Sequence, residues 1–436
     1  MEVINNKTKN QQNKNCSFCN KEIYENEYYI SGGLNNVCLC NECAKLLLTK
    51  YHPFINKNNN FTNNISNNNN TNLLTPSQIK AELDKYIVGQ EDAKRTMATA
   101  IYNHYIRIGQ NSDDIIIDKS NICLIGPTGT GKTEIARSIA NLLNVPFTIC
   151  DVTSITQSGF VGDDVESIIT RLLQNCDYDV ERAEHGIIFL DEFDKLAKTS
   201  GNRSITRDVS GEGVQQGLLK LIEGTDAMVP PQGGRKHPEQ KLIKVNTKDI
   251  LFIVSGAFVG LEDIIYNRLN KGYDNAPKIG FGSNKTIEKP NIDEDYLLEY
   301  VQPEDIIQFG MIPEIVGRLP IITNTNYLSK KSLQKILTEP QNAIIKQYQK
   351  LFSYSNIELT FTKGAIERLA EYAEALQTGA RGLRTCVERV LKEPLFNAPD
   401  IGKENSKKEK DTMFKLQIKK KDIDRELKDF IKIDNK

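Results

Sequence analysis

Eight consecutive residues have the types and spacing of a phosphate-binding loop. They follow the pattern G-x-x-x-x-G-K-[ST] and are Gly126, Pro127, Thr128, Gly129, Thr130, Gly131, Lys132 and Thr133. The glycines let backbone N–H groups turn toward phosphate oxygens without a Cβ in the way, and a helix start adds partial positive charge. Lys132 supplies a point charge for the β and γ phosphates, and the Thr133 hydroxyl can ligate Mg²⁺. The loop predicts a nucleoside triphosphate site.

Two adjacent carboxylates form a second nucleotide motif downstream of this loop. Asp191 and Glu192 directly follow the apolar run Ile187–Leu190. At the carboxyl end of a strand, Asp191 can hold the Mg²⁺ shell while Glu192 orients and activates the attacking water. Acid pairs after apolar runs are common by chance, but their position beyond a complete phosphate loop favours hydrolysis of ATP over binding alone.

Four cysteines near the N-terminus have the spacing of a structural zinc site. Cys16 and Cys19 form one Cys-x-x-Cys pair, Cys40 and Cys43 form a second, and 20 residues separate the pairs. Each pair forms a turn that aims two thiolates at one ion, and four thiolates complete a tetrahedron of Zn²⁺ ligands. Cys38 makes a competing Cys-x-Cys pair with Cys40. A one-residue spacer fits such a turn poorly, so we treat Cys38 as a spare thiol.

The charge of this cysteine-rich module bears on its partner. Residues 1–60 contain seven Lys, no Arg and five Glu, so four zinc-bound thiolates leave the module near neutral. A neutral module matches a nucleic-acid backbone poorly. Its tyrosines and leucines favour protein binding or self-association instead.

A parallel sheet is needed to position the nucleotide motifs. The strand candidates are Ile122–Ile125, Phe147–Cys150, Ile187–Leu190 and Ile250–Val254. Helical periodicity over Glu134–Leu143 and Val165–Leu173 alternates with them. Strands that alternate with helices predict an α/β fold with a doubly wound parallel sheet, and the phosphate loop belongs at the carboxyl edge of that sheet.

We expect four parts along the chain. These are a zinc-binding module over residues 1–55, an Asn-rich flexible linker over 56–74, a large ATPase domain over 75–318, and a smaller, mainly helical domain with a charged tail over 319–436. The Asn-rich tract cannot bury enough apolar surface to offset its ordering entropy. In the last part, Ser332–Leu351 and Gly364–Leu376 have helical spacing, Ile357–Phe361 predicts a strand, and Met413–Ile418 predicts an edge strand.

The bulk composition excludes some classes of protein. The chain has 436 residues, a net charge of −1 and 26% charged residues, so it has no strong field to recruit nucleic acid or an anionic membrane. No apolar run approaches the roughly 18 residues that span a bilayer, and the polar N-terminus is not a secretory signal. Cysteines outside the cluster read as small buried hydrophobes of a reducing compartment. We expect a cytoplasmic protein with no nucleic-acid or membrane partner.

The motifs together resemble one class of ATPase. The two nucleotide motifs, Tyr86-Ile87-Val88-Gly89-Gln90 ahead of them and Gly379-Ala380-Arg381-Gly382-Leu383-Arg384 at a later helix start resemble AAA+ ATPases. The segment Val229–Pro238, the segment Ile279–Phe281 and the four-cysteine module narrow the resemblance to the ClpX family, the regulatory ATPases of the Clp protease. The resemblance covers roughly residues 16–395 and fails only in the Asn-rich linker and the tail.

The resemblance implies roles that the residues alone do not. Ile87 and Val88 would line the adenine pocket, and Arg381 would be the sensor arginine within the subunit. Arg318 would be an arginine finger that reaches a neighbour's nucleotide, a contribution worth about 10³–10⁵ in rate. A finger supplied by a neighbour requires a ring, which in this family is a homo-hexamer. The sensor-one position would hold Ser255, to which we assign no role.

Two segments are implied to line a central pore. Phe160 and Val161 stand between glycines and would grip a polypeptide by apolar contact, whereas the alternative is that Phe160 packs into its own domain. In related unfoldases the position of Phe160 is Tyr. The basic segment Arg235, Lys236 and His237 would form a second pore loop that selects substrate tails by charge, with an ordinary solvated turn as the alternative.

A third segment is implied to contact a partner. Ile279, Gly280 and Phe281 place two large apolar residues in a polar stretch and would dock onto the ClpP peptidase ring, unless they form a local anchor. The sequence has no H-E-x-x-H motif and no recognisable serine or cysteine nucleophile setting, so another chain would have to cut the peptide bond.

The sequence thus predicts an ATP-driven protein unfoldase that acts on tagged substrates and adaptors. One alternative is a nucleic-acid remodelling AAA+ ATPase, such as a branch-migration motor or clamp loader, and the aromatic loop and neutral zinc module count against it. The other alternative is a zinc-dependent adaptor whose ATP site is only a switch. Such a switch would tolerate a dead hydrolysis centre, yet Glu192 is present.

Overall fold

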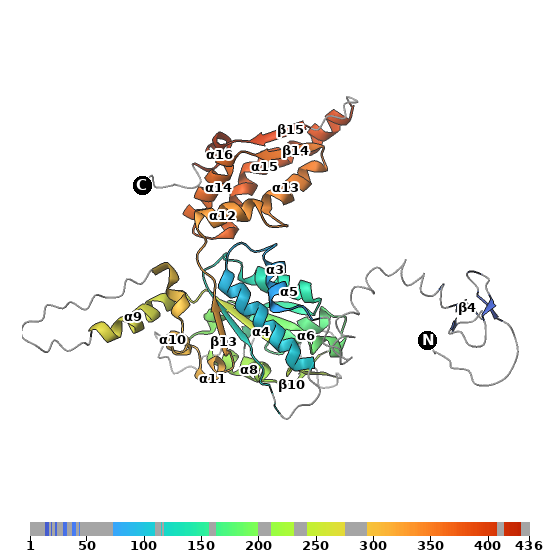
Figure 1. Ribbon diagram of the computed structural model, residues 1–436, viewed down its shortest axis with the longest axis vertical. Coiled ribbons are helices and arrows are strands. Elements are labelled where there is room, and N and C mark those ends of the chain that lie inside the picture. Colours follow the sequence, from blue (N-terminus) through green and yellow to red (C-terminus); the bar gives the residue numbers. More distant parts are fainter. Residues whose placement is uncertain are drawn as a thin grey trace, which may run out of the picture. The chain divides into compact units, whose positions relative to one another are not determined.

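The computed structural model describes residues 14–16, 19, 22–23, 29–32, 37–40, 43, 73–109, 115, 117–156, 163–198, 211–230, 242–274, 294–407 and 414–428 (Figure 1). The chain divides into two compact units, Met1–Asn72 and Leu73–Lys436. Three predicted segments lie outside the described residues, namely Phe160 with Val161, Arg235 to His237, and Ile279 to Phe281. No helix among the described residues is long and apolar enough to cross a membrane.

A five-stranded parallel sheet forms the centre of the second unit. Its strands are β5 (Ile122–Ile125), β6 (Phe147–Asp151), β9 (Ile187–Asp191), β12 (Leu251–Gly256) and β13 (Ile321–Asn324), in the spatial order β13-β5-β12-β9-β6. Every residue of β5 and β12 is buried, on both faces of the sheet. Helices cover both faces of such a sheet, which explains why its strands read as continuous apolar runs rather than alternating ones.

The predicted doubly wound α/β fold is confirmed. The first strand has the predicted bounds, and the ends of the other three differ by one or two residues. Helix α5 (Lys132–Leu143) follows the phosphate loop, and α6 (Ser167–Gln174) lies within the second predicted helical segment, apart from its last residue. Because β5 and β9 are parallel strands of one sheet, the phosphate loop after β5 and the acid pair at the end of β9 lie at the same edge of that sheet.

The sequence did not predict β13. This strand pairs in parallel with β5, from Ile321 opposite Ile122 to Asn324 opposite Ile125. The sheet therefore continues past residue 318, where we placed the end of the large domain. Only two apolar residues begin β13, and the buried Thr323 and Asn324 complete it, so its hydrophobic pattern is too short to read as a strand.

The C-terminal part has a separate hydrophobic core. Its elements are α12 (Lys330–Thr338), α13 (Ile344–Ser353), β14 (Ile357–Phe361), α14 (Lys363–Ala375), α15 (Ala380–Lys407), β15 (Phe414–Ile418) and α16 (Lys420–Leu427). The predicted strand β14 has the expected bounds and pairs in parallel with β15. The helical run predicted over Ser332–Leu351 is two helices, because Pro340 lacks the N–H that a continuous helix needs.

The buried side-chain amide of Asn121 connects three elements at the amino end of β5. Asn121 is 2% exposed and immediately precedes β5. Its Nδ2 donates to the carbonyl oxygens of Ile222 (3.4 Å) and Arg318 (3.1 Å), and its Oδ1 accepts from the Phe252 N–H (3.2 Å). Since Ile222 belongs to α8 (Glu212–Glu223), this one side chain links α8, β12 and the segment before β13.

We expect Asn121→Ala to lower the free energy of unfolding by about 2–3 kcal/mol, because it leaves the buried Phe252 N–H and two carbonyl groups without this partner. Urea unfolding followed by circular dichroism measures the change. Asn246→Ala is the control, because Asn246 is exposed and its side chain accepts only from the nearby Lys248 N–H (2.8 Å). Equal losses of stability for the two variants would contradict the role of Asn121.

Candidate functional site

The phosphate loop connects the end of β5 to the start of α5. Lys132 is the first residue of α5 and is only 8% exposed. Its Nζ lies 2.6 Å from the Gly126 carbonyl oxygen and 2.8 Å from that of Pro127. The ammonium group therefore lies against the loop itself, where its charge is available to an anion that the loop encloses.

Burial also changes the acidity of this lysine. Desolvation lowers the pKa of Lys132 to about 8, and the nearby charge of Arg381 lowers it too, whereas the carboxylates of Asp191 and Asp194 oppose the shift. In the absence of an anion, Lys132 therefore titrates at about pH 8, below the usual range of a lysine.

The acid pair lies beside the start of α5. The Thr133 hydroxyl donates to Asp191 Oδ2 (3.2 Å), so a hydroxyl and a carboxylate oxygen are adjacent. Oxygen ligands of this kind suit Mg²⁺. The Glu192 N–H donates to the other oxygen, Asp191 Oδ1, at 3.0 Å. The geometry thus fits a magnesium ion held by Thr133 and Asp191.

Glu192 has a strained backbone. Its φ of 57° lies in the left-handed region, where a side chain with a Cβ costs roughly 1–2 kcal/mol. This turn separates β9 from the short 3-10 helix Phe193–Leu196 and leaves the exposed Glu192 at the cavity described below. Strain of this kind persists only where the surrounding structure maintains it, and it is found most often at functional sites.

The phosphate loop meets the C-terminal domain through backbone atoms. The Ala380 N–H, at the start of α15, donates to the Gly129 carbonyl oxygen (2.9 Å). A Cβ at Gly129 would lie 2.2 Å from the Thr378 carbonyl oxygen, and a Cβ at Gly379 would lie 2.7 Å from the Gly129 oxygen. Only glycine fits at both positions, and the contact brings Arg381 to the phosphate loop.

The phosphate loop, the acid pair and Arg381 contribute to the lining of one cavity of about 670 Å³. Its lining includes Thr128, Gly129, Gly131, Lys132, Thr133, Asp191, Glu192 and Arg381 from the predicted set. The structure therefore brings together the phosphate loop, the acid pair and the predicted sensor arginine. The arrangement can bind a phosphate chain with Mg²⁺ and hold a water next to a carboxylate.

Asp194 belongs to this cavity and was missed by the sequence reasoning. It is 7% exposed, and its Oδ1 accepts from the Ala257 N–H at 3.2 Å, just after β12. The only sequence signal was its place two residues after the acid pair. Ser255 is fully buried within β12 and does not line the cavity, and its hydroxyl has no hydrogen-bond partner in the part of the chain that the structure describes.

Two of the predicted groups lie elsewhere. Arg318 does not line the cavity; its side chain is 57% exposed and its Nε and Nη2 each lie 2.9 Å from Glu223 Oε1. Ile87 and Val88 do not line it either. Val88 borders a separate cavity of about 320 Å³, and Ile87 is buried.

The first unit brings three of the predicted metal ligands together. Cys16 follows β1 (Lys14–Asn15), and the Sγ atoms of Cys16, Cys19 and Cys43 all lie within 4.8 Å of one another. Tetrahedral zinc with Zn–S bonds of about 2.3 Å needs sulfur atoms about 3.8 Å apart, so this cluster fits. Cys40 is the last residue of β4 (Val37–Cys40), and its side chain lies outside the described residues.

Comparison with known proteins agrees with this architecture. Residues 117–322 match the family model described as AAA domain (Cdc48 subfamily), and residues 328–412 match the C-terminal, D2-small domain, of ClpB protein. The sheet, the phosphate loop and the acid pair thus define an AAA+ ATPase with a small C-terminal domain.

Full-length relatives narrow the class. The chain is 47% identical to the ATP-dependent Clp protease ATP-binding subunit ClpX of Bacteroides thetaiotaomicron over 417 residues, which are 93% of this chain and 98% of the relative. It is also 47% identical to ClpX of Borrelia duttonii over 396 residues (90% and 89%) and to ClpX of Porphyromonas gingivalis over 387 residues (88% and 91%). The chain belongs to the ClpX family, as its motifs predicted.

The lowered pKa of Lys132 predicts proton uptake when nucleotide binds. Below pH 8 the ammonium is already charged, so little uptake is expected near pH 7; above pH 8 the free site has lost its proton and the bound phosphates restore it. We therefore expect ADP binding near pH 8.5 to take up part of a proton. Calorimetry in buffers of different ionisation enthalpy measures it.

Lys132→Arg is the matched variant for this measurement, because a guanidinium stays charged at pH 8.5 and should bind ADP without uptake. Proton-neutral binding by the natural protein at pH 8.5, or the same uptake in Lys132→Arg, would show that another group is responsible.

Proposed function

We propose that this chain is an ATP-driven protein unfoldase that works as a ring of six identical subunits and delivers polypeptides to a ClpP peptidase. The observation that carries the proposal is the cavity that holds the phosphate loop, the acid pair and Arg381 together. Membership of the ClpX family supports the link between that ATP site and proteolysis, since the relatives are named as ATP-binding subunits of an ATP-dependent Clp protease.

The predicted site residues that line the cavity each have a part in hydrolysis under this proposal. Lys132 and the loop N–H groups would hold the β and γ phosphates. Thr133 and Asp191 would hold Mg²⁺, which would neutralise charge on the phosphates. Glu192 accepts a proton from the attacking water. Arg381 senses the phosphates from the first turn of α15, so the contact between Gly129 and Gly379 carries the nucleotide state into the C-terminal domain.

Arg318 acts on a neighbouring subunit in this proposal. Arg318 does not line the nucleotide cavity of its own subunit, and its side chain is exposed. Both observations support a role at the cavity of a neighbouring subunit. A ring would place each Arg318 at the next subunit's phosphates, where a cation stabilises charge that develops in the transition state.

The segments that contact polypeptide and peptidase are proposed from the family resemblance. Phe160 and Val161 grip the substrate, the basic segment Arg235 to His237 selects its tail, and Ile279 to Phe281 dock onto the peptidase. In the first unit, Cys16, Cys19, Cys40 and Cys43 hold Zn²⁺, which supplies folding energy to a module that is too small to form a large core. The module then binds adaptors and tagged substrates.

We expect Glu192→Gln to lower kcat for ATP by about 10²–10⁴-fold, because an amide cannot accept the proton of the attacking water. Nucleotide binding should persist, so ATP-bound rings should accumulate. Steady-state ATPase assays and size-exclusion chromatography with light scattering report both effects. Glu181→Gln, on the exposed face of a short helix, is the control, and undiminished hydrolysis in Glu192→Gln would remove Glu192 from this role.

We expect Phe160→Ala to keep ATPase activity within about twofold while unfolding of a tagged fluorescent protein is lost, because a methyl group offers little surface to pack on a threaded chain. Loss of substrate fluorescence in the presence of ATP is the readout. Phe160→Tyr keeps the ring and should retain unfolding.

Normal unfolding by Phe160→Ala would refute the grip. ATP hydrolysis that requires duplex DNA, tested in the same assay, would refute the unfoldase itself.

A further inference from the structure

A short segment before the phosphate loop is tied down at both ends by polar contacts. It runs from Asp84 to Gln90, between α3 (Pro76–Leu83) and α4 (Glu91–Gly109), and we call it the strap. It contains Ile87 and Val88, which the family resemblance implies as adenine contacts and which we propose in that role. At its first end the anchor is Lys94, on the first turns of α4.

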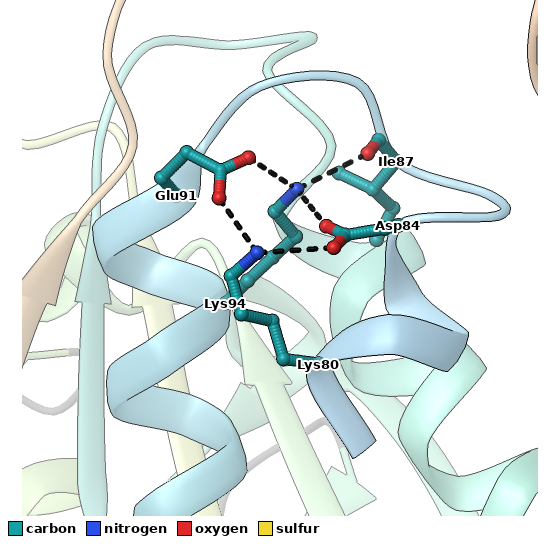
Figure 2. A network of polar contacts seen from close by, with 5 residues as sticks. All are labelled: Lys80, Asp84, Ile87, Glu91 and Lys94. Atoms are coloured by element: carbon teal, nitrogen blue, oxygen red, sulfur yellow. Dashed lines mark hydrogen bonds and ion pairs between the residues drawn. The ribbon is translucent and has the colours of Figure 1, made fainter. Parts of the chain in front are cut away.

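Lys94 is buried, with 1% of its surface exposed. Its Nζ contacts the Asp84 carboxylate, Glu91 Oε1 (2.8 Å) and the Ile87 carbonyl oxygen (3.4 Å), as Figure 2 shows. A buried charge is costly unless it is paired, so these contacts are required wherever Lys94 is buried. One of them fixes the backbone of a proposed adenine contact.

Lys80 provides a natural comparison within the same network. Its Nζ lies 3.0 Å from Asp84 Oδ2 and 2.7 Å from Glu91 Oε2, so the two lysines share the same two carboxylates (Figure 2). Hydrogen bonds from Lys80 and then Lys94 hold the pKa of Glu91 below its usual range. Of the two lysines, Lys94 is the one that contacts the strap carbonyl of Ile87.

The other end of the strap contacts residues 325–329, which connect β13 to α12; we call this segment the interdomain linker. Gln90, at a φ of 56°, donates from Nε2 to the Asn326 carbonyl oxygen (2.9 Å) and accepts at Oε1 from the Asn326 N–H (2.8 Å). Asn326 lies between the end of β13 and the start of α12. The Lys85 carbonyl oxygen also accepts from the Gln341 N–H (2.8 Å) of the C-terminal domain.

Neighbouring cavities connect the strap to the phosphate loop along this linker. Val88 borders the cavity of about 320 Å³ together with Tyr327 and Leu328. The same two linker residues border a cavity of about 510 Å³ whose lining includes Thr128 and Thr130 of the phosphate loop. The linker is therefore the element that strap and phosphate loop have in common.

We propose that Lys94 and Gln90 are positioning residues for the base of the nucleotide: Lys94 fixes the strap carbonyl of Ile87 so that the base finds a preformed seat, and Gln90 passes occupancy of that seat to the interdomain linker through Asn326. This inference rests on the proposed ATP site and deepens it. It makes the purine end of the substrate, and not only its phosphates, a determinant of the linker's state.

The role of Lys94 is tested by comparing Lys94→Met with Lys80→Met in the full chain. Each variant leaves one lysine with the same two carboxylates, but Lys94→Met alone removes the donor to Ile87. We expect Lys94→Met to raise KM for ATP about tenfold with kcat within about twofold, and Lys80→Met to change KM less than about twofold. Inhibition by inorganic tripolyphosphate, which has no base, should be equal in both.

Lys94→Gln covers the case in which Lys94→Met fails to fold, since an amide keeps a donor for the Ile87 oxygen; its KM should lie between those of the natural protein and Lys94→Met. Equal KM changes in Lys94→Met and Lys80→Met, or weakened tripolyphosphate inhibition in step with KM, would overturn the role of Lys94.

The role of Gln90 is tested by amide hydrogen exchange with and without ADP. In the natural protein, ADP should slow exchange in peptides that cover residues 325–329 and in those that cover the phosphate loop. In Gln90→Ala the slowing should persist at the phosphate loop and disappear at the linker, because the Asn326 N–H has lost its acceptor.

Equal ADP-dependent protection of the linker in Gln90→Ala would overturn the coupling. Failure of the ATP site itself has a different signature, because ADP would then protect neither the phosphate loop nor the linker in the natural protein.

Discussion

The backbone contact between Gly129 and the start of α15 is the constraint on which the nucleotide site depends. The Gly129 carbonyl oxygen accepts from the Ala380 N–H, and neither Gly129 nor Gly379 has room for a Cβ, so the C-terminal domain contacts the loop here through main-chain atoms. That contact brings Arg381 into a cavity whose other walls come from the sheet edge. Residues from two parts of the chain that have separate hydrophobic cores thereby line one cavity.

The charges of the site follow from this enclosure. Burial disfavours the charged form of Lys132, and the carboxylates of Asp191 and Asp194 only partly compensate. The negative charge of a phosphate ligand would stabilise the ammonium form of Lys132. Because this lysine is enclosed, its electrostatic attraction to phosphate is stronger than that of an exposed lysine would be. The left-handed backbone of Glu192 adds conformational strain at the same cavity.

Sequence reasoning recovered what is encoded locally. The phosphate loop, the acid pair and the strand Ile122–Ile125 each lie in a short continuous segment, and the structure places them in one sheet edge. Asp194 was missed because the N–H that its carboxylate accepts from belongs to Ala257, 63 residues further along the chain. The pairing of Gln90 with Asn326 spans 236 residues and has no pattern in the sequence at all.

The strand β13 and the break at Pro340 show the limits of periodicity. Tertiary pairing with β5 makes a strand of a segment whose second half is polar, and a single proline divides a run that otherwise keeps helical spacing. The roles of the segments around Phe160, Lys236 and Gly280 stay predictions, because those segments lie outside the described residues.

The surface pair of Arg318 and Glu223 has a consequence for assembly. Its side chains are 57% and 39% exposed, and an exposed ion pair of this kind is worth about 0–1 kcal/mol. The main chain of Arg318, in contrast, is fastened by the buried Asn121. Arg318 therefore has a fixed main chain and a weakly held guanidinium, which can exchange its carboxylate for another anion at little cost in free energy. In the ring proposed above, Arg318 would turn to a neighbouring subunit's phosphates without losing a strong contact.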